Sequence, residues 1–193
     1  MLDFTPVRER TSTLGALMAD MSVADLKAAT NAQIDAVLNI IADCTDADVV
    51  FQPVDPAAND AAAADAAETN IAWTLGHVIV HITAGGEETS FLAAELARGV
   101  ANHGRSRYEV YWETITTIVQ VRQRIEESRR MRVGALALWP DEPNLDEHVT
   151  FPFLEGPINA KAYFALGLLH EDSHLAQIGE IVRQAQAARQ VDA

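Results

Sequence analysis

The stretch YFALGLLHEDSHLAQIGEI, residues 163–181, carries apolar residues at the spacing of an amphipathic helix. The face that holds His170 and His174 is otherwise apolar, so we predict that it turns toward the core of a helical protein. Residues four apart lie one above the other on a helix, so both imidazoles can reach one point, such as a metal ion. A single buried histidine more often bonds a carboxylate or a carbonyl, and that alternative stays open.

Three further segments show helical periodicity, and no segment shows the alternation of a β-strand. Ser22 with Asp25, and Ser106 with Glu109, have the spacing of capping boxes, which mark helix starts. The four predicted helices span residues 22–44, 70–99, about 106–139 and about 157–190. We therefore predict an all-α protein with the architecture of a four-helix bundle whose longer loops permit crossover connections.

The 193 residues suffice for one domain, 1–193. Two of the connections between the predicted helices are long loops. Residues 46–69 are rich in alanine and aspartate, and we expect a flexible insert without an assigned role. The loop PDEPNLDEHVTFPFLEGP, residues 140–157, is long enough to wall a pocket.

The composition limits the partners of the chain. A formal net charge of −14, from 28 acidic and 14 basic residues, repels nucleic acids and anionic membrane surfaces. The first residues lack the apolar core of a signal peptide, and no run is long and apolar enough to cross a bilayer, so we expect a cytoplasmic protein. Cys44, the one cysteine, is expected to pack as a small hydrophobic residue.

A second pair of histidines, His77 and His81, has the same spacing on the second predicted helix. Gly85 and Gly86 follow and are expected where another helix approaches closely. Because bundles build metal sites from side chains on facing helices, the two pairs together favour a site for one divalent ion. Zinc is the first expectation, with nickel or iron as alternatives.

The sequence HEDSH also matches the H-E-x-x-H pattern of zinc proteases. That chemistry needs a third protein ligand, but the continuation LAQIGEIVRQ contains no histidine. Glu171 leaves the helix about 100° away from His170, so we expect that it is not a general base. Both observations disfavour a protease.

Two segments carry a resemblance to a known family. Trp73-Thr74 with His81 eight residues after Trp73, and His170-x-x-x-His174-x-x-Gln177-Ile178, resemble the two signatures of the DinB/YfiT-like metal-binding superfamily. The resemblance implies an up-down-down-up four-helix bundle that often forms homodimers. It also implies that His81, His170 and His174 bind one divalent metal. Some similar proteins are transferases or isomerases that use a low-molecular-weight thiol, and many have no assigned activity.

Other residues are expected around such a site. His77 is predicted to lie beside it without being a fourth ligand. Gln177 is predicted to bond a ligand or a metal-bound water, and Glu171 to orient an imidazole. The arginines of the third helix are expected on a solvated face paired with glutamates; they are Arg122, Arg124, Arg129, Arg130 and Arg132.

Two functions remain open from the sequence. The first is a metal-dependent enzyme acting on a small molecule, either a hydrolase or a transferase that uses a thiol. The alternative is a metal-stabilised bundle with a binding or stress-response role and no catalysis. The enzyme needs an open coordination position facing a pocket, whereas the structural site needs a fourth protein ligand, for which His77 is the candidate.

Overall fold

The computed structural model describes residues 1–59, 69–104 and 110–191. Within these ranges the chain is helical, apart from one isolated antiparallel bridge between Val149 and Ile158, so the predicted all-α class is confirmed. The helices are α1 (Thr5–Arg8), α2 (Leu14–Leu17), α3 (Val23–Ile40), α4 (Asp46–Val49), α5 (Leu75–Ala97), the 3-10 helix η2 (Trp112–Thr114), α6 (Ile118–Leu136) and α7 (Ala160–Val191). None of the helices in these ranges combines the length and apolarity needed to cross a membrane.

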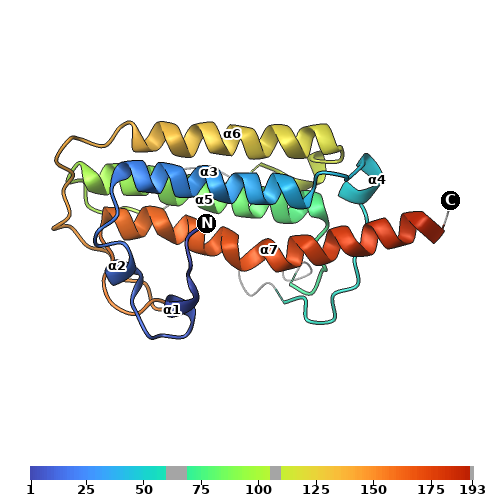
Figure 1. Cartoon of the computed structure of the whole chain (residues 1–193), viewed down its shortest axis with the longest axis horizontal. Helices are drawn as coiled ribbons and strands as arrows, with labels where there is room; N and C mark the ends of the chain where they lie inside the picture. The colour runs from blue at the N-terminus through green and yellow to red at the C-terminus, as the bar shows by residue number, and fades with distance from the viewer. Residues whose placement is uncertain (60–68, 105–109, 192–193) are drawn as a thin grey trace.

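The four long helices lie side by side along the long axis of the molecule (Figure 1). Helix α5 contacts α6 and α7, and α3 contacts the same two helices. The colours of Figure 1 show that α3 and α7 run in one direction and that α5 and α6 run in the other. The short helices α1 and α2 lie below the first half of α7, and the segment of residues 51–59 lies below its second half. The middle of α7 lies between these two regions.

Three helix starts show where local sequence signals succeed and where they fail. The capping box of Ser22 at the start of α3 is confirmed. Helix α5 begins at Leu75, not near residue 70, because Thr74 caps it by accepting from the His77 backbone N–H at 3.2 Å. Helix α6 begins at Ile118, not near residue 106, because Thr117 forms its own capping box.

The region before α6 also departs from the predicted helix. Residues 110–117 contain only the short η2 turn, and Ile115 packs its carbonyl against α5, where a β-carbon at Gly76 would lie 2.5 Å from the Ile115 oxygen. The predicted capping box of Ser106 and Glu109 lies outside the described residues. The insert predicted at residues 46–69 contains a helical turn, α4.

The core consists of two apolar clusters at opposite ends of the bundle. One gathers around Leu26, Leu96 and Phe164, and the other around Ile34, Ile79 and Ile178. Along each long helix, buried polar residues lie between the two clusters: Thr30 and Gln33 on α3, Thr83, Glu87 and Ser90 on α5, Ser128 and Arg132 on α6, and Glu171 on α7. A polar layer therefore crosses the middle of the bundle.

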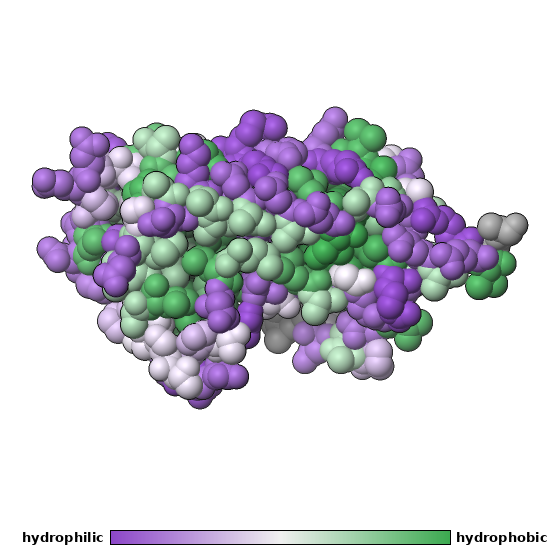
Figure 2. Space-filling view, viewed as in Figure 1, coloured by the Kyte–Doolittle hydropathy of each residue, from purple (hydrophilic) through white to green (hydrophobic). Residues whose placement is uncertain are grey.

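Two arginines of α6 correct the prediction of a solvated face. Arg130 is exposed, as predicted, and the edge formed by α6 is mostly hydrophilic (Figure 2). Arg124 and Arg132, however, are only 5% and 1% exposed, and they form ion pairs with Glu87 of α5 and Glu171 of α7. Glu87 and Glu171 lie on other helices, so the sequence of α6 alone carries no sign of this burial; Arg124 also pairs with Glu127 of α6.

Candidate metal centre

Three histidines from two helices meet at the seam between α5 and α7. His81 comes from α5, and His170 and His174 come from successive turns of α7. Each offers one ring nitrogen, and these three nitrogens lie within 4.8 Å of one another. The Nε2 atoms of His81 and His170 are 2.9 Å apart, so one of them donates a hydrogen bond to the other. Among the residues that the structure describes, this is the group whose donor atoms can hold a metal ion.

The histidines do not face the core, and the prediction from the apolar stripe is wrong on this point. All three rings are partly exposed, whereas the neighbouring Glu171 is buried and faces the interior. One residue on a helix corresponds to about 100° of rotation, so an inward Glu171 places His170 toward the flank of the bundle. The three imidazoles therefore line a surface that small molecules can reach.

Two neighbours fix the histidine rings. A β-carbon at Gly85 would lie 2.9 Å from Nδ1 of His170, so the absence of a side chain there makes room for this ring. The indole of Trp73 packs against His81 with ring centroids 4.6 Å apart and against His174 at 5.9 Å. The predicted close approach at Gly85 is confirmed, and the spacing from Trp73 to His81 in the sequence corresponds to a direct ring contact.

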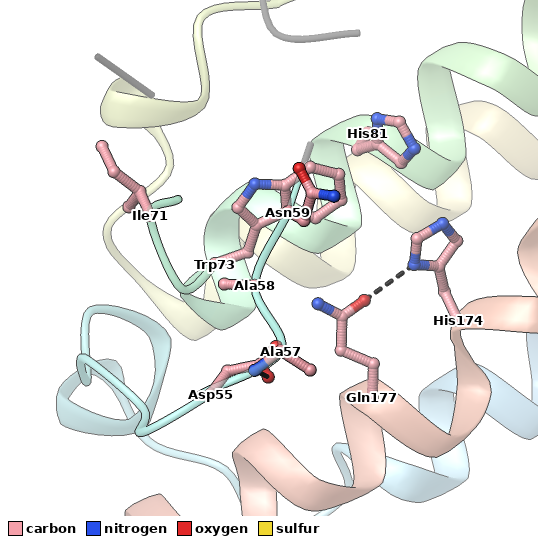
Figure 3. Close-up of a pocket in the computed structure, with 9 residues that line it drawn as sticks. All are labelled: Asp55, Ala57, Ala58, Asn59, Ile71, Trp73, His81, His174 and Gln177. Atoms are coloured by element: carbon pink, nitrogen blue, oxygen red, sulfur yellow. Dashed lines mark hydrogen bonds between the residues drawn. The ribbon is translucent and has the colours of Figure 1, made fainter. Parts of the chain in front are cut away.

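Gln177 contacts the ring of His174 through its side-chain amide. Its Oε1 atom lies 2.7 Å from Nδ1 of His174 (Figure 3). Because an amide oxygen can only accept, the proton lies on Nδ1, and Nε2 is left with a lone pair for a ligand. Buried or half-buried partners of this kind orient metal-binding histidines in many proteins.

His77 lies outside the group of three. Its ring is stacked between Trp73, at a centroid distance of 4.6 Å, and Trp112, at 4.5 Å. Trp73 also packs against His174, with ring centroids 5.9 Å apart. His77 thus contacts an indole that covers the group of three, and its place beside the site without being a fourth ligand stays a prediction.

A pocket of about 340 Å³ opens in front of His81 and His174 (Figure 3). Trp73, Ile71 and Gln177 form part of its lining, and the opposite wall comes from the segment after α4. That segment contributes Asp55, Ala57, Ala58 and Asn59. No role was predicted for this part of the insert, because nothing in its spacing links it to α7, more than a hundred residues away.

A second pocket of about 370 Å³ reaches His170 from the first half of α7. Its lining is mostly apolar, with Leu166 and Leu169 of α7 facing Val7, Phe153 and Leu154. Phe153 and Leu154 belong to the loop of residues 140–157, which was predicted to wall a pocket, and this is confirmed. The three histidines therefore lie between a polar pocket and an apolar one.

A comparison with protein-family models gives one match, to the DinB superfamily, over residues 29–178. The match begins within α3, ends within α7 and includes the three histidines. The chain belongs to the DinB superfamily. Searches of curated proteins and of solved structures returned no match to it.

The carboxylates of this DinB-superfamily chain do not support protease chemistry. Glu171 is buried and accepts from Nη1 of Arg132 at 2.8 Å, so its carboxylate points away from the pocket. Glu180 is exposed on the next turns, where hydrogen bonds from Arg183 and Gln184 lower the pKa of its carboxyl to about 2. Neither group is placed to act as a general base beside the histidines.

Cys44 is buried next to α4, as predicted for a small packed residue. Burial, and then the charge of Asp48, raise the pKa of its thiol above the ordinary value. A neutral thiol in the core is a poor nucleophile. Cys44 is therefore not part of the candidate site.

Proposed function

We propose that this DinB-superfamily protein binds one divalent metal ion through His81, His170 and His174 and uses it to catalyse a reaction of a small molecule. Zinc is the first candidate, with nickel or iron as alternatives. One observation carries the proposal: three imidazole nitrogens from two helices lie within 4.8 Å of one another beside an open pocket. The donor set fits such an ion, because neutral imidazoles suit zinc, nickel and iron.

The architecture is part of the proposal. The helix directions in Figure 1 support an up-down-down-up four-helix bundle, in which the parallel neighbours α5 and α6 need a long crossover. Residues 98–117 supply that connection. In such a bundle, α5 and α7 are neighbours that present their histidines to one seam.

A group of three protein ligands among the described residues favours catalysis over a structural site. Structural zinc sites have four protein ligands, whereas catalytic sites keep a position for water or substrate. His77, the candidate for a fourth ligand, is stacked between two indoles. When bound, the ion would supply Lewis acidity that activates a water molecule or a thiol near neutral pH.

The residues of the chain would orient the reactants. Gln177 holds His174 in one tautomer, and Trp73 covers His81 and His174 and excludes water from that side. Asp55 and Asn59 offer polar groups at the far wall of the pocket. A volume of about 340 Å³ suits a small molecule and not a protein chain. A hydrolase and a transferase that uses a low-molecular-weight thiol both fit this arrangement.

The test compares metal-free protein with protein reloaded with zinc, nickel or iron. Small thiols are supplied with electrophilic acceptors in one set of reactions, and small esters and amides in another. We expect turnover only in reloaded protein and at least a hundredfold loss in His174→Ala. Equal rates for metal-free and reloaded protein in every reaction would favour a non-catalytic metal-binding bundle.

A further inference from the structure

The ion pair of Arg132 and Glu171 is the most deeply buried charged contact in the described part of the chain. Each side chain is 1% exposed, and Nη1 of Arg132 donates to Oε2 of Glu171 at 2.8 Å. The pair joins α6 to α7 within the polar layer between the two apolar clusters.

The stability of the fold does not explain this pair. Nε and Nη2 of Arg132 and Oε1 of Glu171 are buried and have no hydrogen-bond partner among the described residues. Removing two charges from water is costly, and incompletely bonded buried pairs are often less stabilising than apolar residues of the same volume. A different role has to account for the glutamate at position 171.

The position of the pair indicates what that role is. Glu171 directly follows His170 on α7 and precedes His174 by three residues. The guanidinium of Arg132 passes over Gly86 of α5, where a β-carbon would lie 2.7 Å from Nη1. The adjacent Gly85 makes room for the ring of His170. Two consecutive glycines thus accommodate the ion pair on one side of α7 and the histidine on the other.

We infer that Arg132 and Glu171 are positioning residues that set the rotation of α7 about its axis and so hold His170 and His174 at the pocket. The inference rests on the proposed metal site. The apolar stripe around the histidines favours a second arrangement, in which α7 is turned by about 100° and the imidazoles face the core. In that arrangement Arg132 would remain buried without a counter-charge, and this cost excludes the rotated arrangement.

The first test measures metal affinity in Arg132→Met by calorimetric titration with zinc. Without its partner, a buried Glu171 turns toward solvent, and the rotation of α7 moves His170 and His174 away from the pocket. We therefore expect the zinc affinity to fall on the order of 10- to 100-fold. Adding Glu171→Leu places an apolar residue that stays in the core, and the double variant should regain the affinity of the wild type to within about threefold. If Arg132→Met does not fold, Arg132→Gln also leaves Glu171 without a counter-charge and should show the same loss.

The matched control is Arg124→Met, which removes the other buried arginine of α6. Arg124 pairs with Glu87 of α5 and does not contact α7 through an ion pair. We expect its melting temperature to fall while its zinc affinity stays unchanged. Wild-type affinity in folded Arg132→Met, or no recovery in a folded double variant, would overturn the inference.

A second measurement needs no metal. Nitrogen NMR of histidine-labelled, metal-free protein reports the hydrogen bonds between His81 and His170 and between His174 and Gln177. We expect distinct, hydrogen-bonded ring nitrogens in the wild type and in the double variant, and averaged signals in Arg132→Met. If the wild type shows these spectra but binds no zinc, the positioning role is retained and the metal site is rejected. Identical spectra in all three proteins would reject the positioning role.

Discussion

His77 lies between two indole rings, one turn before the histidine that joins the candidate metal group. Trp73 contacts His77 on one side, and its ring also packs against His81 and His174. The imidazole of His77 therefore shapes the wall of the site through Trp73. Its stacking between Trp73 and Trp112 occupies both faces of the ring.

We predict that His77→Ala retains one metal ion per chain, because the three nitrogens of the site come from other histidines. Loss of the stacked ring frees Trp73, so affinity should change by less than about tenfold, and tryptophan fluorescence should shift. Elemental analysis and fluorescence of the purified variant give both readouts. A variant with no metal, beside a loaded wild type, would make His77 a ligand.

Individual residues also show what the sequence could predict about the site. The spacing of His170 and His174 placed these two histidines together, and the resemblance to the DinB/YfiT-like superfamily added His81. The direction that these histidines face could not be predicted, because the apolar stripe of α7 and the buried charge of Glu171 favour opposite rotations. The rotation of α7 depends on Arg132 of α6, which is the partner of Glu171 and lies 39 residues from it in the sequence.

At the scale of elements, the helices formed where local signals agree with tertiary packing. The capping box at Ser22 and the long periodic segment of α7 marked real helices. The starts of α5 and α6 were predicted too early. Thr74 caps α5, and the residues before α6 form only a short 3-10 turn, with the Ile115 carbonyl against Gly76 of α5. Such a contact between distant segments has no sign in the local periodicity.

The seam between α5 and α7 gives a prediction about glycine. In Gly85→Ala the new β-carbon would overlap Nδ1 of His170, so the ring must move. We expect metal affinity to fall on the order of tenfold and the free energy of unfolding to fall by about 1–3 kcal/mol. Titration with zinc and urea unfolding measure the two effects.

The control for this prediction is Gly179→Ala, on α7. A β-carbon at Gly179 meets no atom within 4 Å, so this change only improves helix propensity. We expect a gain of roughly 0.5–1 kcal/mol in stability and unchanged metal affinity. Equal metal affinity in both alanine variants would show that Gly85 is not needed to seat His170.

At the scale of the whole molecule, two apolar clusters enclose a polar layer, and the histidines lie at the edge of that layer. Tyr163 belongs to the cluster nearer the N-terminus of α7. Burial of its phenol, and then the charge of Glu88, raise the pKa of Tyr163 from 10.0 to about 12. The folded protein therefore holds this proton more tightly than the unfolded chain.

The sign of the pH dependence follows from this difference. The stability contributed by the neutral phenol is complete below pH 10 and is lost as the pH rises toward 12. We expect the wild type to lose up to about 1 kcal/mol more per pH unit than Tyr163→Phe over this range. Urea unfolding at pH 9, 10 and 11 measures both slopes, and parallel slopes would contradict the assignment.

The metal content of single alanine variants shows whether His81, His170 and His174 share one metal ion. Untagged wild type, His174→Ala and His148→Ala are each stripped, reloaded with zinc, desalted and analysed for metal. His148 is exposed in the 140–157 loop and bonds the Asp146 carbonyl, so it serves as the matched control. We expect one ion per chain in the wild type and in His148→Ala, and almost none in His174→Ala, if the three histidines share one ion. One tightly bound ion in His174→Ala would contradict the shared site.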